Sequence, residues 1–218
     1  MRLMGRHLTA DKGGVGIWLA ALLLAIAPVD EARVRALVGD WDRFAELEAM
    51  GRDVLPVLAR LYEQSDLAER REIANVFYRL GWESPEAKQV LLADLHTADP
   101  NLRLSVQWAL GRVSGDEDVV PLLLEIMRDD PNPLFRDKAA CALASDQIHI
   151  DPAQRLRLLA GLVGALEDPK PQVRQIALQA LQIHTGQTKG FQPNGQPEAR
   201  AAAVARWRRW LAEYERNL

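Results

Sequence analysis

The chain has a single cysteine, no excess of positive charge and no apolar run long enough to cross a membrane. Because Cys141 is alone, the fold cannot rest on a disulfide framework within the chain and must be held by an apolar core. The net charge of −3 argues against a dedicated nucleic-acid-binding protein, which usually carries a basic excess. We therefore expect no nucleic-acid partner.

The sequence also lacks the motifs of the common catalytic and cofactor sites. The histidines lie far apart, and none has a second ligand at metal-binding spacing: His7, His96, His149 and His184. No glycine-rich phosphate loop follows a strand pattern, and no Ser/His/Asp or Cys/His set is recognisable. The sequence therefore predicts no catalytic residue, no cofactor and no metal site.

A repeated helical pattern is present instead. Residues 168–181 read DPKPQVRQIALQAL, an Asp-Pro turn followed by a helix whose apolar residues, three and four apart, share one face. The alanines on that face, Ala177 and Ala180, are small enough for a second helix to approach closely. Similar stretches occupy residues 99–110 and 130–143.

A degenerate copy follows Asp66 and places Ala74, Phe77 and Tyr78 on its core face. The arginines of the four copies are separated by 32, 33 and 38 residues: Arg71, Arg103, Arg136 and Arg174. A period of this length is typical of an α-solenoid, in which each unit is a pair of helices. We attribute the longer last interval to a connection over residues 146–151.

The predicted fold is therefore all-α, a right-handed α-solenoid of about four to five antiparallel helix pairs over residues 28–184. Residues 185–196 are rich in glycine and predict a loop. A last helix restarts at Pro197, and its apolar stripe contains Trp207 and Trp210. We expect residues 185–218 to form this loop and a helix that caps the open end of the core.

The first 27 residues have a different character. Basic residues precede eleven apolar ones, Ile17–Ala27, in the manner of a secretory signal peptide, so we expect export to the periplasm or cell envelope of a bacterium. Pro28 disfavours cleavage at the end of this run. Retention as a weak membrane anchor through residues 13–29 therefore stays open, as does an apolar first helix that caps the solenoid.

Helix pairs with Asp-Pro turns, an early arginine in the second helix and an early proline in the first, such as Pro56 and Pro121, resemble HEAT repeats. The short period is similar to that of the bacterial HEAT-like repeats also found in phycobilin lyase subunits, and the resemblance covers residues 31–184. It implies that the turn aspartates and helix arginines form a structural ladder between repeats: Asp99, Asp130, Asp168, Arg103, Arg136 and Arg174.

The helical period also predicts which residues line a groove. Counted from each arginine, positions −1, +3, +6 and +7 face the core at about 100° per residue, and positions +1, +4, +5 and +8 face away. Trp108 is the strongest candidate anchor, because tryptophan is enriched in binding hot spots. The residues expected to contact a partner are Glu72, Asn75, Arg79, Leu104, Gln107, Trp108, Asp137, Gln175, Gln179 and Gln182. The remaining residues at these positions are Val76, Gly111, Ala140, Cys141, Ala144 and Leu178. For Cys141 the period conflicts with its surroundings, because a cysteine within an apolar helical pattern is usually a small buried residue.

These features predict a non-catalytic scaffold or adaptor that holds a protein partner or peptide segment on the concave face of the solenoid. The alternative is an enzyme or enzyme subunit of the HEAT-like bilin lyase type. A deep pocket with converging polar groups would favour the enzyme, whereas an open, shallow groove would favour the scaffold.

Export can be tested in a bacterial host. We expect the full-length chain in the envelope fraction and a chain that begins at Val29 in the cytosol, because the basic and apolar start would direct only the first to the membrane. Cell fractionation followed by immunoblotting measures both. Equal cytosolic recovery of the two chains would contradict export.

Overall fold

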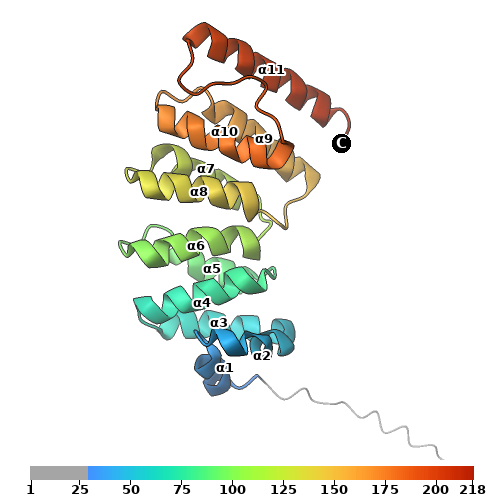
Figure 1. Ribbon diagram of the computed structural model, residues 1–218. Helices are drawn as coiled ribbons and strands as arrows, with labels where there is room; N and C mark the ends of the chain where they lie inside the picture. Colours follow the sequence, from blue (N-terminus) through green and yellow to red (C-terminus); the bar gives the residue numbers. More distant parts are fainter. Residues whose placement is uncertain (1–28) are drawn as a thin grey trace, which may run out of the picture.

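The computed structural model describes residues 29–218, and the predicted signal or anchor segment, residues 1–27, lies outside the described residues. The described chain is entirely helical in its regular structure, with eleven α-helices and two short 3-10 helices. The helices pack in pairs that follow one another in a single stack (Figure 1). The prediction of an all-α solenoid of helix pairs is confirmed.

Five pairs make up the stack. The first helices of the pairs are α1 (Glu31–Leu37), α3 (Val54–Gln64), α5 (Pro85–Ala93), α7 (Val119–Asp129) and α9 (Pro152–Ala165). The second helices are α2 (Phe44–Ala49), α4 (Leu67–Leu80), α6 (Pro100–Val113), α8 (Pro133–Ser145) and α10 (Pro171–Thr185). The 3-10 helices are η1 (Trp41–Arg43) and η2 (Gly51–Asp53), and α11 (Pro197–Glu215) ends the chain. In Figure 1 the helices α4, α6, α8 and α10 lie in front of α3, α5, α7 and α9.

Proline and short polar residues determine where many of these helices begin. A proline occupies the start of α5, α6, α8, α9, α10 and α11, where its missing N–H would have had no helical partner. The Ser84 hydroxyl accepts a hydrogen bond from the Ala87 N–H at 3.0 Å, and the Asp99 carboxylate accepts one from the Leu102 N–H at 2.7 Å. These caps fix the turns that lead into each helix.

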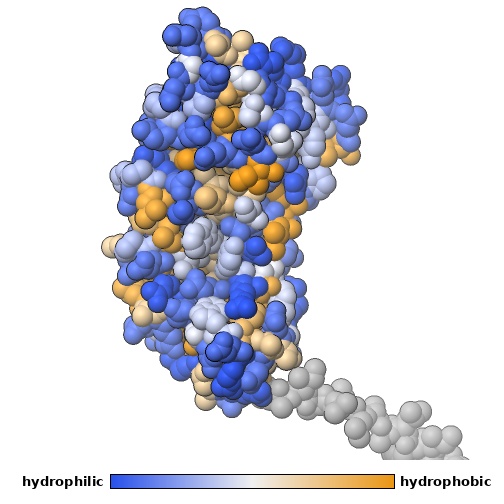
Figure 2. Space-filling model, viewed as in Figure 1, coloured by the Kyte–Doolittle hydropathy of each residue, from blue (hydrophilic) through white to orange (hydrophobic). Residues whose placement is uncertain are grey.

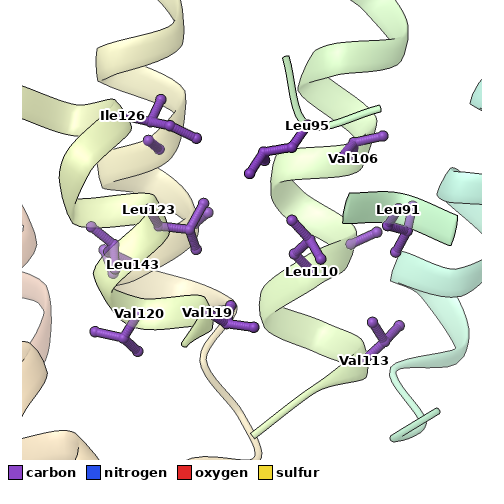
Figure 3. Packing of buried hydrophobic residues seen from close by; sticks show 14 of the residues in the cluster. Leu91, Leu95, Val106, Leu110, Val113, Val119, Val120, Leu123, Ile126 and Leu143 are labelled. Carbon is purple, nitrogen blue, oxygen red and sulfur yellow. The ribbon is translucent and has the colours of Figure 1, made fainter. Parts of the chain in front are cut away.

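The core runs the length of the stack and is built by one face of each helix. Side chains of α5 and α6 meet those of α7 and α8, with Leu91, Leu110 and Leu123 all buried (Figure 3). Ala139 and Ala177 are completely buried at the predicted core positions of α8 and α10. The predicted core positions of α6, α8 and α10 are therefore confirmed.

The predicted phase of α4 is wrong by one residue. Arg70, not Arg71, donates from Nε to the main-chain carbonyls of Tyr62 and Ser65, at 3.0 and 3.1 Å. Arg71 pairs with the neighbouring Glu72 at 2.7 Å. Since one residue turns a helix by about 100°, this shift exchanges core and surface positions. As a result, Val76 is fully buried and Tyr78 only half-buried, the reverse of the expectation.

The predicted ladder between repeats is present in part. Arg103 pairs with Asp130 of the next pair, and Arg70 pairs in the same way with Asp94 at 3.2 Å. Arg136 and Arg174 instead donate to main-chain carbonyls of the turns that precede their helices. Asp99 caps α6 and Asp168 accepts from the Lys170 N–H, so both have structural roles within their own turns.

The last helix packs against the final pair of the stack. Trp207 of α11 is fully buried, and Trp210 is half-buried with its ring 5.5 Å from that of Trp207. Helix α11 packs against α9, and Arg174 Nε donates to the Pro193 carbonyl of the preceding loop at 2.8 Å. The indoles thus cover apolar surface that the last pair would otherwise expose to water.

The connection over residues 146–151 is more than a spacer. His149 Nε2 lies 2.8 Å from the Gly81 carbonyl and 2.9 Å from the Arg112 carbonyl, so it joins the ends of α4 and α6. The connection passes so close to Gly111 that a Cβ atom there would lie 2.1 Å from Gln147 Nε2 and 3.0 Å from the Asp146 carbonyl oxygen. Only glycine leaves room for this approach.

Two glycine-to-alanine substitutions test this contact. We expect Gly111→Ala to lower the free energy of unfolding by about 1–3 kcal/mol, the usual cost of overpacking. Gly164→Ala in α9, where nothing lies within 4 Å of the added Cβ, should raise it by up to about 1 kcal/mol through helix propensity. Denaturant unfolding followed by circular dichroism measures both. Stabilisation by Gly111→Ala would contradict the close packing of the connection.

Candidate functional site

The exposed side of α4, α6, α8 and α10 forms one continuous surface built by repeated elements, which we call the second-helix face. These four helices lie side by side, each against the next. Figure 2 views the molecule from this side and shows apolar patches interrupted by polar residues. The face therefore offers both apolar contact area and hydrogen-bonding groups.

Two adjoining pockets lie between α8 and α10 on this face. They have volumes of about 490 and 370 Å³ and share Asp137, Ile176 and Gln179 as lining residues. Because they share three lining residues, we treat them as one feature and call it the α8–α10 groove. It is shallow and open to solvent, and it is built by two successive helix pairs.

Small, apolar and amide side chains make up most of the groove lining. Ala140 and Ala144 of α8 are nearly buried and form part of its floor. Ile176 is half-buried, whereas Ile183 is 63% exposed and so is available for contact. Asn194, from the loop between α10 and α11, reaches the end of the groove nearest to the start of α10. The lining can accommodate both apolar side chains and hydrogen-bonding groups.

Most of the predicted groove residues of α8 and α10 line this groove. Asp137 and Gln179 line both pockets, Gln175 lines one, and Gln182 lines the other. The sequence interpretation missed Gln172, Ile176, Ile183 and Asn194. Ile176 and Ile183 could have been recognised from the sequence. They lie seven residues apart, so they share a helix face, and that face is not the one predicted for the core.

Cys141 is exposed and lines the groove, so its interpretation as a buried apolar residue is wrong. It lies at the +5 position from Arg136, which faces away from the core. Partial desolvation and the negative charge of Asp137 raise the pKa of the Cys141 thiol above its usual value. The thiol is therefore less reactive than an ordinary surface cysteine.

The middle of the second-helix face carries an aromatic pair. Trp108 of α6 is half-buried against the core, with its ring 6.3 Å from that of Tyr78 of α4. The Arg112 guanidinium lies 4.7 Å from the centre of the Tyr78 ring and 3.3 Å from the Asp146 carboxylate. Burial raises the pKa of Asp146. Leu104 is also half-buried against the core.

The predicted contact residues of α4 lie outside the α8–α10 groove. Asn75 is half-buried, and Glu72 is engaged by Arg71. The exposed Arg79 places its guanidinium 4.3 Å from the centre of the Phe44 ring and 5.6 Å from that of Trp41. These contacts direct Arg79 toward the first helix pair. They do not bring it together with the groove residues of α8 and α10.

Gln107 was predicted to contact a partner, and this is wrong. Its side chain is fully buried, and neither its carboxamide nitrogen nor its oxygen has a hydrogen-bond partner among the described residues. Leu178, Val76 and Gly111, placed on the same face by the period, are buried as well. Each of these helices packs against one or two neighbouring second helices, and those neighbours cover outward positions that lie at the edges of the helix face.

Two of the three described histidines, His149 and His184, contact main-chain carbonyls. His184 Nε2 lies 2.9 Å from the Leu143 carbonyl, and burial lowers the pKa of its imidazole. Among residues 29–218, no group of three or more His, Cys, Asp or Glu side chains is arranged to bind a metal ion. None of the helices in that part of the chain has the length and hydropathy needed to cross a membrane.

Comparison with known proteins gives one positive result. The family model of HEAT repeats matches residues 55–144, which correspond to the three pairs from α3 to α8. No curated protein and no solved structure gives a significant match to the chain. The predicted resemblance is thus confirmed for these three pairs.

The burial of Gln107 leads to a stability prediction. An unpaired buried amide costs about 1–3 kcal/mol, so we expect Gln107→Leu, which has a similar volume, to raise the free energy of unfolding by an amount of this order. Gln179→Leu on the exposed face should change it by no more than about 0.5 kcal/mol. Thermal and urea unfolding measure both. A destabilised Gln107→Leu variant would show that the amide is satisfied, for instance by a buried water molecule.

Proposed function

Because residues 55–144 are HEAT repeats, we propose that this protein is a non-catalytic scaffold that binds a protein segment on its second-helix face. HEAT repeats are commonly protein-binding scaffolds, and stacked helix pairs present an extended surface suited to this role. The observation that carries the proposal is the α8–α10 groove. It is open along the face and is lined by side chains from two successive pairs.

The shape of the groove supports binding rather than chemistry. An enzyme or enzyme subunit of the bilin lyase type would be favoured by a deep pocket on which polar groups converge. The described pockets of the second-helix face are shallow, and their lining mixes alanine and isoleucine with amides. Two nearby groups with raised pKa values, Cys141 and Asp146, owe the shift mainly to burial, and Lys138 owes its raised pKa to its pairing with Asp137.

The cellular location belongs to the same proposal. The basic and apolar start of the chain supports export, which would place the scaffold in the periplasm or cell envelope of a bacterium. Its partner would then be an envelope protein or a peptide segment presented there. A net charge of −3 gives no support to a nucleic-acid partner.

The scaffold proposal predicts the effect of truncating Trp108. The full-length chain, used as bait in extracts of its own cell type, should capture a specific protein that mass spectrometry can identify. Trp108→Ala should weaken binding of the purified partner by about 2 kcal/mol, as expected for an aromatic anchor. Because the indole is only half-buried, the loss of stability should be smaller than the roughly 3–5 kcal/mol of a core aromatic.

Trp210→Ala is the matched control. Trp210 is also half-buried but belongs to the capping helix α11, away from the second-helix face. We expect it to lower the melting temperature while leaving the affinity for the partner unchanged. If the Trp108→Ala variant binds the partner as tightly as the parent chain does, the middle of the second-helix face is not part of the binding surface. A failure of every face variant to affect binding would contradict the proposed function.

A further inference from the structure

We propose that the α8–α10 groove binds an extended, uncharged peptide segment by hydrogen bonds from side-chain carboxamides to the peptide main chain. This inference rests on the proposed function and specifies the class of partner. It comes from an array of amide side chains along the groove and from the contacts that already engage its two charged lining residues, Arg136 and Asp137.

Four glutamines form a stripe along α10. Gln172, Gln175, Gln179 and Gln182 stand at positions i, i+3, i+7 and i+10, which share one face of a helix. With a rise of 1.5 Å per residue, successive members are spaced by about 4.5–6 Å along the helix axis. All four are exposed, and each lines at least one of the two pockets. Asn194 adds a fifth carboxamide at the end of the stripe.

These carboxamides are not used within the fold. Among residues 29–218, none of the five makes a side-chain hydrogen bond to another protein group, and all five are exposed to solvent. Elsewhere in the same chain, glutamines hold the main chain. Gln154 Oε1 accepts from the Asp151 N–H at 2.8 Å, and Gln154 Nε2 donates to the Gly115 carbonyl. The stripe offers the same two groups to a segment from outside.

The chemistry of a carboxamide selects a peptide main chain. Each amide carries an N–H donor and a carbonyl acceptor, the same pair that a peptide unit presents. In an extended chain, main-chain groups on one side recur about every 6.6–6.8 Å, a spacing that flexible glutamine side chains on the stripe can follow. A bound helix could not use the stripe, because its own hydrogen bonds already occupy its main-chain groups.

The charges of the groove favour an uncharged ligand. The Asp137 carboxylate lies 3.0 Å from Lys138 Nζ, and the Arg136 guanidinium donates to the carbonyls of Asp130 and Pro131. The Asp137 charge is thus paired, and N–H groups of Arg136 are already occupied by carbonyls of the same chain. Ile176 and Ile183, with the alanine floor, provide space for small apolar side chains that alternate with the main-chain contacts.

Selection from a random library of short linear peptides, displayed on phage and panned on the full chain, tests this inference. We expect enrichment of peptides with low net charge. A selected peptide, synthesised with a fluorophore, should lose at least about tenfold in affinity for the Gln175→Ala/Gln179→Ala variant, since each lost hydrogen bond is worth a few-fold to tenfold. Methylation of alternate main-chain nitrogens of the peptide should weaken its binding to the parent chain by a comparable factor. This change removes main-chain donors of the peptide without changing its side chains.

The matched control is Gln64→Ala/Gln89→Ala, which removes two exposed glutamines from the first helices α3 and α5. It should bind the selected peptide as tightly as the parent chain does. Equal affinity of the Gln175→Ala/Gln179→Ala variant and the parent would overturn the inference. Enrichment of only charged or helix-forming peptides, no enrichment at all, or insensitivity to N-methylation would overturn it as well.

Failure of this inference is distinguishable from failure of the scaffold function. A captured partner whose binding depends on Trp108 but not on Gln175 and Gln179 would preserve the proposed function and remove the carboxamide groove from it. A partner whose binding depends on all three residues supports both.

Discussion

Hydrogen bonds from one arginine near the start of α4, α6, α8 and α10 determine the arrangement of the second-helix face. The guanidinium donates to main-chain carbonyls of the turn before the helix in four successive pairs: Arg70, Arg103, Arg136 and Arg174. A bond to the preceding turn fixes the rotation of the helix about its own axis. Rotation in turn decides which side chains enter the core and which reach the surface. Arg70 and Arg103 also pair with a carboxylate of the next repeat, so the same group positions the neighbouring pair.

This dependence explains where prediction from sequence succeeds. In α6, α8 and α10 a single arginine precedes the core face, and counting from it places the core residues correctly. In α4 two arginines are adjacent, and the sequence provides no chemical difference between Arg70 and Arg71. Counting from Arg70 or from Arg71 places Phe77 in the core, so its apolar side chain does not distinguish the two phases. The apolar spacing of Ile73 and Val76, both fully buried, was the signal that favoured Arg70.

Contacts between distant parts of the chain could not be predicted in this way. Residues 146–151 were correctly recognised as a connection, but His149 reaches the Gly81 carbonyl across 68 positions of sequence. Gly111 carries no sequence sign that another segment passes over it. The burial of Gln107 depends on how closely the neighbouring helices pack, which a helical period does not contain. Periodicity predicts the direction of a side chain from its own helix, whereas burial depends also on what lies in that direction.

The two halves of the second-helix face differ in the state of their polar groups. Toward the N-terminus the charged groups are already engaged, with Arg71 on Glu72, Arg112 on Asp146 and Arg79 over aromatic rings. A ligand that used these groups would first have to break existing contacts, whereas a ligand at the carboxamide stripe displaces only water. Polar recognition is therefore least costly at α10, while Tyr78 and Trp108 offer mainly apolar area. Since amides carry no net charge, recognition at the carboxamide stripe is little affected by ionic screening. Hydrogen bonds that replace bonds to water contribute little net free energy, so apolar contacts must supply most of the affinity.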